Sequence, residues 1–308
     1  MLSNIVASTK LIVILGPTAV GKTILAVQLA LKIKGEIISA DSRQVYRGMD
    51  LGTGKDLDEY EVNENQIPFH LIDILEAGQT YNLFDFQRDF YTAHDSILER
   101  DKIPILCGGT GLYLEAALSE KRLLEVPINE ELREELKNKS QDDLNEKLLA
   151  ISESIHNTTD TVDRERTIRA IEIETFKKQN IAEDSPITDF IVFGIKADRE
   201  IIKTRIELRL KERLSSGMIE EVKALLDSGV SLERLNYYGL EYKFIGNYLS
   251  GLISYDEMYS KLLQAIHRFA KKQMTWFRRM EKRGVKIHWI DGELSLEEKL
   301  NKIKAELK

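Results

Sequence analysis

Short apolar runs alternate along the first part of the chain with longer segments in which apolar residues recur every three or four positions. A run of four to eight apolar residues is typical of a buried strand, and the wider spacing is typical of an amphipathic helix. The runs predict strands at residues 11–15, 36–40, 69–74, 103–107 and 190–196, and helical patterns fill the gaps, notably at residues 83–100 and after residue 111. This alternation predicts an α/β fold with a mostly parallel sheet.

The alternation stops between residues 119 and 185, where no strand pattern occurs. That stretch is charged, helical in pattern and bounded by Pro127 and Pro186, so it predicts an all-helical insertion. We therefore expect a core made of residues 1–118 and 186–308 and an insertion domain at 119–185. After residue 198 the pattern predicts a helical C-terminal region, with helices at residues 199–215, 218–226 and 255–280. Ser254 and Ser295 each precede a Glu by three positions, which predicts a capping box at two helix starts.

A complete phosphate-binding loop follows the first predicted strand and precedes a helical pattern. It consists of Gly16, Pro17, Thr18, Ala19, Val20, Gly21, Lys22 and Thr23. In such a loop glycines let backbone N–H groups turn toward phosphate oxygens, the lysine supplies positive charge, and the threonine hydroxyl reaches a Mg²⁺. The context predicts a P-loop NTPase-like core. It does not say whether the phosphate is transferred, hydrolysed or released.

Four polar residues follow the second predicted strand: Asp41, Ser42, Arg43 and Gln44. Ligands of open α/β sheets bind beyond the carboxyl ends of the strands, so Asp41 is expected beside the phosphate-binding loop. An aspartate there can be a general base, a partner of Mg²⁺ through water, or a cap of the next turn. The three polar side chains after it favour a recognition surface, because Arg and Gln donate to bases and phosphates.

The fourth predicted strand ends in glycines at residues 108, 109 and 111, whereas many P-loop ATPases and GTPases have there an acid that helps hold Mg²⁺. The glycines, with Thr110 and Tyr113, suit a channel wall around a ligand. Asp73, at the end of another apolar run, could replace the acid. The pattern disfavours nucleotide hydrolysis. A second glycine-rich segment at residues 51–55 is either a surface turn or part of the site.

Composition and charge narrow the class further. The chain has 308 residues, 43% hydrophobic and 31% charged, and no apolar run approaches the ~20 residues that span a bilayer. Cys107 is the single cysteine, which excludes disulfides within the chain and fits a reducing cytoplasm. The net charge of −7 disfavours a generally basic nucleic-acid binder. Residues 261–288 nevertheless hold nine Lys or Arg and a single acid, together with aromatic residues, which indicates an anion or nucleic-acid contact.

Together these motifs resemble the tRNA dimethylallyltransferase family, also called tRNA isopentenyltransferases. The matching segments are residues 16–23, 41–50, 108–113 and 272–278, in order over nearly the whole chain; each alone is modest, and the set is specific. The resemblance implies transfer of a dimethylallyl group from dimethylallyl diphosphate to N6 of adenosine 37 in tRNAs that read codons beginning with U. It implies Mg²⁺ as cofactor and the tRNA anticodon stem-loop as partner. We expect a cytoplasmic monomer without membrane association.

The resemblance also implies roles for individual residues. Asp41 matches the catalytic aspartate, which would accept the proton of N6. Thr18 is expected near the bridging oxygen and Thr23 near Mg²⁺. Lys22 and backbone N–H groups would stabilise the charge that builds on the leaving diphosphate. Arg209 matches an arginine that helps hold the diphosphate; without the resemblance it would be taken for a solvated helix arginine.

The implied tRNA contacts lie in three segments. They are Asp41, Ser42, Arg43 and Gln44, then Thr110 in the channel, and Arg164, Arg166 and Arg169 at the end of the insertion. Adenosine 37 would leave the anticodon-loop stack to enter the channel. Salt bridges within the helix are the alternative role for the three insertion arginines. Two segments depart from the family pattern, at residues 156–160 and 237–243, and both fall in expected tRNA-contacting regions.

Two other functions stay open. A small-molecule P-loop kinase would share the fold and a helical lid, but it would need basic lid residues at the γ-phosphate of ATP, and the insertion has more acids than bases. A non-catalytic RNA-binding P-loop protein could use the basic C-terminal helix. It would not explain why Asp41 faces the phosphate-binding loop.

Overall fold

The computed structural model describes residues 11–152 and 161–307 and divides into two compact units. The first unit, the core, comprises Met1–Leu118 and Ile187–Lys308, and the second, the helical unit, comprises Ser119–Pro186. Each has a hydrophobic cluster of its own, which is what allows a segment to form a separate compact body.

The core contains a six-stranded sheet in which every neighbouring pair is parallel. The strands, in spatial order, are β5 (Phe69–His70), β2 (Gly35–Ala40), β6 (Ile103–Gly108), β1 (Ile12–Leu15), β7 (Ile191–Lys196) and β8 (Ile287–Asp291). All four residues of β1 are buried, and Ile12 lies opposite Ile105 and Ile191. A central strand covered on both faces reads as an unbroken apolar run, which is why it was visible in the sequence. The predicted α/β class is confirmed.

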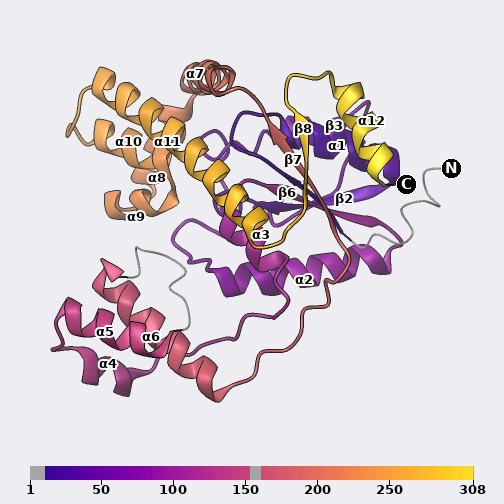
Figure 1. Cartoon of the computed structure of the whole chain (residues 1–308). Helices are drawn as coiled ribbons and strands as arrows, with labels where there is room; N and C mark the ends of the chain where they lie inside the picture. Colours follow the sequence, from indigo (N-terminus) through magenta and orange to yellow (C-terminus); the bar gives the residue numbers. More distant parts are fainter. Residues whose placement is uncertain (1–10, 153–160, 308) are drawn as a thin grey trace. The chain divides into compact units, whose positions relative to one another are not determined.

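Helices cover both faces of this sheet. On one side lie α1 (Lys22–Ile33) and α12 (Leu296–Glu306), and on the other α2 (Leu83–Glu99) and α3 (Gly111–Ala117), as Figure 1 shows. A short 3₁₀ helix, η2 (Leu57–Tyr60), packs against α1, and β3 (Glu61–Val62) pairs with β4 (Asn65–Gln66) in a small antiparallel ribbon. The two chain segments of the core thus share one sheet.

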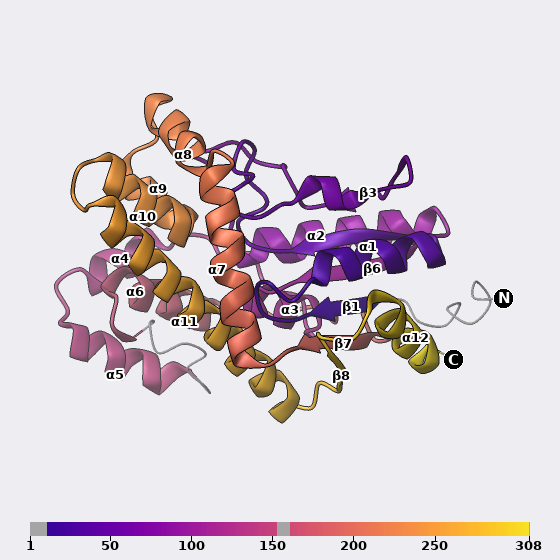
Figure 2. The ribbon, with the colours of Figure 1, turned by 90° about the horizontal axis from the view of Figure 1, so that it is seen from above.

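Five helices form the C-terminal region of the core. They are α7 (Arg199–Ser215), α8 (Met218–Asp227), α9 (Leu232–Tyr238), α10 (Leu240–Leu249) and α11 (Tyr255–Lys282). Figure 2 shows α7 between the sheet and the group α8–α10. The Ser295 hydroxyl and the Glu298 carboxylate form the predicted reciprocal capping box of α12. At α11 only half of the predicted box is present, since Ser254 accepts from the backbone N–H of Glu257.

Two features of the core differ from the sequence prediction. The strand expected at residues 69–74 ends at His70, because Leu71 and Asp73 adopt left-handed backbone angles (φ of 63° and 54°) that no strand accommodates. Strand β8 was not predicted at all. It is short and follows a 28-residue helix, and it is stabilised as a strand by its pairing with β7.

The helical unit holds α4 (Glu130–Leu136), α5 (Gln141–Ile151) and α6 (Arg164–Gln179). They enclose a small cluster formed by Leu136, Leu144, Leu148, Ile168 and Ile171. The two ends of the unit run side by side: the N–H of Arg122 donates to Glu183 O and that of Ser185 to Glu120 O, both at 2.8 Å. The described part of this unit contains an isolated bridge between Lys121 and Asp184 and no longer strand. Residues 156–160 lie outside the described residues.

Candidate active site

A cavity of about 1000 Å³ opens at the carboxyl ends of β1, β2 and β6. The phosphate-binding loop, the segment 41–44 and residues 107–112 line it, and further walls come from the segment 52–60 and from α7, α9, α10 and α11. Of the predicted site residues it brings together Thr18, Ala19, Gly21, Lys22, Thr23, Asp41, Ser42, Arg43, Gln44, Thr110 and Arg209. Carboxyl ends of parallel strands are where α/β sheets bind ligands, so the location fits the sequence argument.

The phosphate-binding loop has the backbone that its glycines allow. Gly21 adopts a left-handed conformation (φ 81°) directly before α1, and it leaves the first turn of the helix without a side-chain cap. The unpaired N–H groups of that turn are therefore free to bind an anion. Gly16 is required because a Cβ there would lie 2.7 Å from the carbonyl oxygen of Ile195. Val20 is buried in the core and serves as scaffold.

Lys22 lies in the loop beside its own backbone, where its ammonium donates to the carbonyl of Pro17 at 2.7 Å. The pKa of Lys22 is lowered to about 8, with burial as the main cause and the nearby Arg209 as a further one, while Cys107 and Asp41 act in the opposite direction. Burial disfavours the charged form of Lys22, and a nearby anion favours it. The lysine is therefore suited to binding an anion.

Gln273 of α11 ties the loop to the strand end that was predicted as a channel wall. Its side-chain oxygen accepts from the N–H of Thr18 at 2.8 Å, and its amide nitrogen donates to Gly109 O at 2.9 Å. A Cβ on Gly109 would collide with that amide. Gln273 is 7% exposed. Its segment was recognised as a motif, but nothing in the sequence showed that a residue 255 positions away would hold the loop.

Arg209 reaches the same loop from α7. Its guanidinium donates to the Thr18 hydroxyl, so two predicted catalytic residues, 191 positions apart, are in contact. Burial lowers the pKa of Arg209 to about 10, and the neighbouring Arg213 contributes to the decrease. Arg209 is half-buried and bound to the loop, so it is not the solvated helix arginine that the local sequence would suggest.

Asp41 caps the turn after β2 and also lines the cavity. One carboxylate oxygen accepts from the N–H of Arg43 at 2.9 Å, which caps the turn after β2. The residue nevertheless lines the cavity beside the phosphate-binding loop. The Thr110 hydroxyl accepts from the N–H of Ser42 at 3.2 Å, so the turn and the channel residue are fixed to each other. The carboxylate is thereby held in place without losing its access to the cavity.

The glycine-rich segment 51–55 belongs to the cavity wall. Gln44 donates to Gly54 O at 2.9 Å and accepts from the Ser39 hydroxyl at 2.9 Å, so its amide is already engaged within the chain. Lys55 is buried, and its ammonium binds Tyr46 O and the Asp50 carboxylate, both at 2.7 Å. These contacts settle the choice between a surface turn and a built wall in favour of the wall.

Two secondary expectations were wrong. Asp73 does not replace the missing acid, because its carboxylate pairs with Lys55 and it does not line the cavity. Tyr113 is not a channel residue either. It is 4% exposed and stacks on Phe86 with ring centroids 3.9 Å apart, so it belongs to the core.

Four carboxylates that the sequence argument did not single out line the cavity: Asp56, Glu59, Glu212 and Glu241. Glu59 comes from η2, and burial together with Asp56 raises its pKa to about 7. Glu241 opens α10, within the segment that departs from the family pattern, and burial raises its pKa as well. An acid on a 3₁₀ turn with no motif around it carries no recognisable sequence signal.

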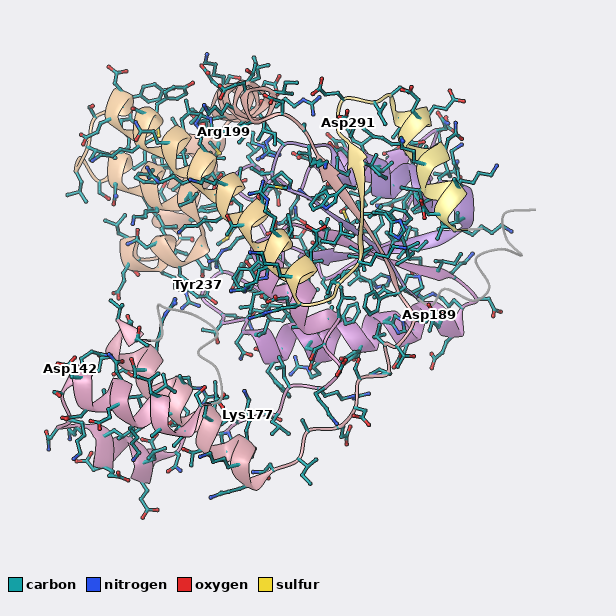
Figure 3. The ribbon with its side chains drawn as sticks, viewed as in Figure 1. Asp142, Lys177, Asp189, Arg199, Tyr237 and Asp291 are labelled. Carbon is teal, nitrogen blue, oxygen red and sulfur yellow. The ribbon has the colours of Figure 1, made fainter. Side chains whose placement is uncertain are left out.

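Cationic and aromatic side chains surround this part of the core. Arg43 and Arg234 lie over the ring of Tyr237, each 4.9 Å from its centroid; Figure 3 labels Tyr237 on α9. From the basic helix α11, Arg268 and Lys272 line the cavity and are exposed. Such a rim matches the anion contact predicted from the basic stretch 261–288.

The three arginines of the helical unit have different surroundings. The guanidinium of Arg164 donates to the carbonyls of Leu136, Lys137 and Lys139 at 2.6–2.8 Å, closing the end of α4. Arg169 donates to Val126 O at 2.6 Å and to the Glu172 carboxylate at 2.9 Å. Arg166 is exposed, and within the described part of the chain its side chain makes no hydrogen bond.

Glu172 is the centre of the polar network in that unit. Its carboxylate is buried and accepts from Arg133 Nε at 2.7 Å, from Arg169 Nη1 at 2.9 Å and from the N–H of Asn129 at 3.1 Å. Burial alone would raise the pKa of Glu172, but these donors together lower it to about 2. Two of the three predicted tRNA-contacting arginines thus have structural partners in the helical unit.

The comparisons with known proteins agree with this site. The family model described as IPP transferase matches residues 44–280, and the one described as isopentenyl transferase matches residues 9–67. The chain is 55% identical over 295 residues to a tRNA dimethylallyltransferase 2 of Phocaeicola vulgatus, covering 95% of this chain and 96% of the relative. It is 54% identical over 296 residues to a tRNA dimethylallyltransferase 1 of Parabacteroides distasonis, covering 95% and 96%.

A solved structure leads to the same family. A tRNA isopentenylpyrophosphate transferase of Bacillus halodurans superposes with a TM-score of 0.72 at 32% identity, covering 97% of this chain and 96% of that one. Within the described residues no helix is long and apolar enough to cross a membrane. The match decides against the kinase and against a non-catalytic RNA-binding protein. By sequence, fold and site, this chain belongs to the tRNA dimethylallyltransferase family.

Proposed function

We propose that this enzyme performs its family's reaction with the cavity residues in defined roles. It is a tRNA dimethylallyltransferase that modifies adenosine 37. The finer proposal is that the phosphate-binding loop holds the diphosphate of dimethylallyl diphosphate and that the acceptor tRNAs read codons beginning with U. The observation that carries it is the convergence of Thr18, Lys22, Asp41 and Arg209 on one cavity.

The diphosphate end is built to stabilise a leaving group. When N6 of the adenine attacks C1 of the dimethylallyl group, a C–N bond forms, the C–O bond breaks, and the electron pair passes to the diphosphate. Lys22, Arg209 and the N–H groups at the start of α1 surround the position where that charge develops. Each preorganised donor of this kind contributes roughly 3–4 kcal/mol to transition-state stabilisation. The Thr18 hydroxyl, which accepts from Arg209, then donates to the bridging oxygen.

Asp41 is proposed to accept the proton that N6 loses. The lone pair of N6 is delocalised into the purine, so a general base that removes the proton during attack is needed. The carboxylate oxygen that accepts from Arg43 N–H orients the group, and the other oxygen is left for the amine. Thr110, bonded to the same turn, is proposed to line the path of the extruded base.

Mg²⁺ fits this site as an ion bound jointly with the diphosphate. The described residues contain no cluster of three or more His, Cys, Asp or Glu that could hold a metal. Mg²⁺ commonly keeps several waters and is bound through substrate phosphates and few protein ligands, which suits such a site. The Thr23 hydroxyl would bind it, and Asp41 or Glu59 would receive hydrogen bonds from its waters. The ion would neutralise part of the diphosphate charge.

In the core, the tRNA is proposed to contact the half-buried Arg43 and the exposed Arg268 and Lys272 at the cavity rim. In the helical unit, the exposed Arg166 is proposed as a further phosphate contact. Phosphate contacts position a nucleic acid without reading its sequence. The enzyme is proposed to act as a monomer, since a single chain supplies each residue to which the proposed reaction assigns a role. Its substrate tRNA places the reaction in the cytoplasm.

One incubation tests the proposal. Purified protein, Mg²⁺, labelled dimethylallyl diphosphate and unmodified tRNA should give label in RNA, and a tRNA with guanosine at position 37 should stay unlabelled. Asp41→Asn keeps the acceptor for Arg43 N–H but cannot take a proton, so turnover should fall by roughly 10²–10⁴ while tRNA affinity stays within about twofold. A parallel loss of both would make Asp41 a binding residue. Absence of label in adenosine-37 tRNA would contradict the assigned reaction.

A further inference from the structure

Helix α7 contributes Arg205, Arg209 and Arg213 to the cavity lining, and the last two lie about one helical turn apart. Arg209 donates to the Thr18 hydroxyl of the phosphate-binding loop. Arg213 lines the cavity too, but its Nη2 donates to both carboxylate oxygens of Asp56, each at 2.9 Å. The Arg213 side chain is 11% exposed and that of Asp56 37% exposed. The Arg213 guanidinium is therefore engaged by a partly buried ion pair with Asp56 and not by the phosphate-binding loop.

Asp56 stands on a fixed support. The Glu221 carboxylate accepts from the N–H groups of Asp50, Leu51 and Gly52 at 2.8–3.0 Å, which anchors the segment that leads to it. The Arg213 guanidinium packs flat on this segment, since a Cβ at Gly54 would lie only 2.8 Å from the guanidinium carbon. The ion pair is therefore formed against an ordered wall segment.

The Asp56–Arg213 pair affects the net positive charge near the phosphate-binding loop. Lys22, Arg209 and Arg213 are all cavity cations, and Asp56 neutralises one of them. A diphosphate is attracted by each cation that it can reach, and after the reaction the same attraction retains it as product. An enzyme whose leaving group is bound too tightly releases it slowly, and product release limits many turnovers.

We propose that the Asp56–Arg213 ion pair sets the affinity of the site for diphosphate by holding Arg213 back from the anion. This inference rests on the proposed function, because it takes the cavity to hold a departing diphosphate. The competing explanation is that the pair only braces the wall. The two explanations predict different changes in diphosphate affinity when single partners are replaced. If the pair only braces the wall, removal of either partner weakens the binding of diphosphate.

The experiment measures the binding of inorganic diphosphate with Mg²⁺ to the full-length enzyme by titration calorimetry. Asp56→Asn frees the Arg213 charge and should tighten binding by about three- to tenfold, the effect of one partly screened charge near an anion. Arg213→Met leaves the Asp56 charge uncompensated and should weaken binding by a similar factor. The double variant removes both charges and should bind like the wild type.

Two controls keep the interpretation clear. Asp56→Glu retains the charge and should bind like the wild type. Lys211→Met removes a cation of the same helix that pairs with Glu207 outside the cavity, and it too should have no effect. Weaker binding by both Asp56→Asn and Arg213→Met, or unchanged binding by both, would overturn the proposal. In the prenylation assay, Asp56→Asn should show a lower inhibition constant for added diphosphate.

This measurement separates the inference from the proposed function. If the wild type binds no diphosphate, the assigned role of the phosphate-binding loop fails. If it binds diphosphate and transfers the prenyl group, but the two single variants shift affinity in the same direction, only the role of the ion pair fails.

Discussion

Replacing Gln273 by Met should uncouple the phosphate-binding loop from the glycines that follow β6. Methionine keeps most of the side-chain volume and removes both hydrogen bonds, to Thr18 N–H and to Gly109 O. The N–H of Thr18 is partly buried and costs about 1 kcal/mol when it is left unpaired, whereas the buried Gly109 O costs roughly 1–3 kcal/mol, so we expect a loss of about 2–4 kcal/mol in the free energy of unfolding. For a core of this size, that corresponds to a fall in Tm of about 5–15 °C.

The same change should slow the reaction. Thr18 carries the hydroxyl that accepts from Arg209, and a loop that is no longer fixed holds this group less accurately. A misplacement of this kind costs about 10–100-fold in kcat, whereas tRNA affinity should stay the same. Thermal unfolding and single-turnover prenylation measure the two effects. Gln264→Met, an exposed change on the same helix, is the control. A Gln273→Met enzyme with wild-type Tm and kcat would refute the coupling.

Three further results are expected. Because burial lowers the pKa of Lys22 to about 8, the affinity for diphosphate should stay constant below that pH and fall above it, where the ammonium loses its proton. A Lys22→Arg enzyme should show an affinity that does not change over this pH range when it is measured by calorimetry. A decline of affinity in both enzymes would assign the titration to another group. Arg166→Glu should weaken tRNA binding and make its dependence on salt concentration less steep. Arg164→Glu should chiefly lower Tm, because Arg164 binds the carbonyls at the end of α4. Equal salt dependence of tRNA binding in the two variants would contradict these different roles. Glu172→Gln should destabilise the helical unit by about 3–5 kcal/mol. Since the pKa of Glu172 in the folded protein is lowered to about 2, the stabilisation by this carboxylate should be present above pH 4.5 and lost toward pH 2. An acid unfolding transition that the substitution leaves unchanged would refute this expectation.

Much of the fold could be predicted because its strands are buried on both faces. The apolar runs at residues 11–15, 36–40 and 103–107 mark central strands of the parallel sheet. Strand β8 escaped prediction because it lies at the sheet edge, and three of its five residues, His288, Trp289 and Asp291, are not buried. Left-handed residues such as Leu71 gave no warning either, since nothing in a leucine indicates a positive φ.

The residues of the site likewise fall into two groups, those with a local sequence motif and those whose partners are distant in the sequence. The phosphate-binding loop and Asp41 could be predicted, because spacing along the chain reflects their chemistry. Gln273 and Asp56 could not, because their roles depend on partners more than 150 positions away in the sequence. For Arg164 the sequence offered phosphate contact or salt bridging, and the structure shows a third role, the binding of helix-end carbonyls.

The paired ends of the helical unit bear on how this family can vary. Because the chain leaves the core at residue 118 and returns at residue 187 through two adjacent backbone segments, the insertion closes a loop whose ends already meet. Loop-closure entropy grows only slowly with length, so residues can be added or removed between those ends at little cost to the sheet. Evolution can therefore remodel the insertion as an interchangeable module while the phosphate-binding loop, Gln273 and the Asp56–Arg213 pair stay untouched.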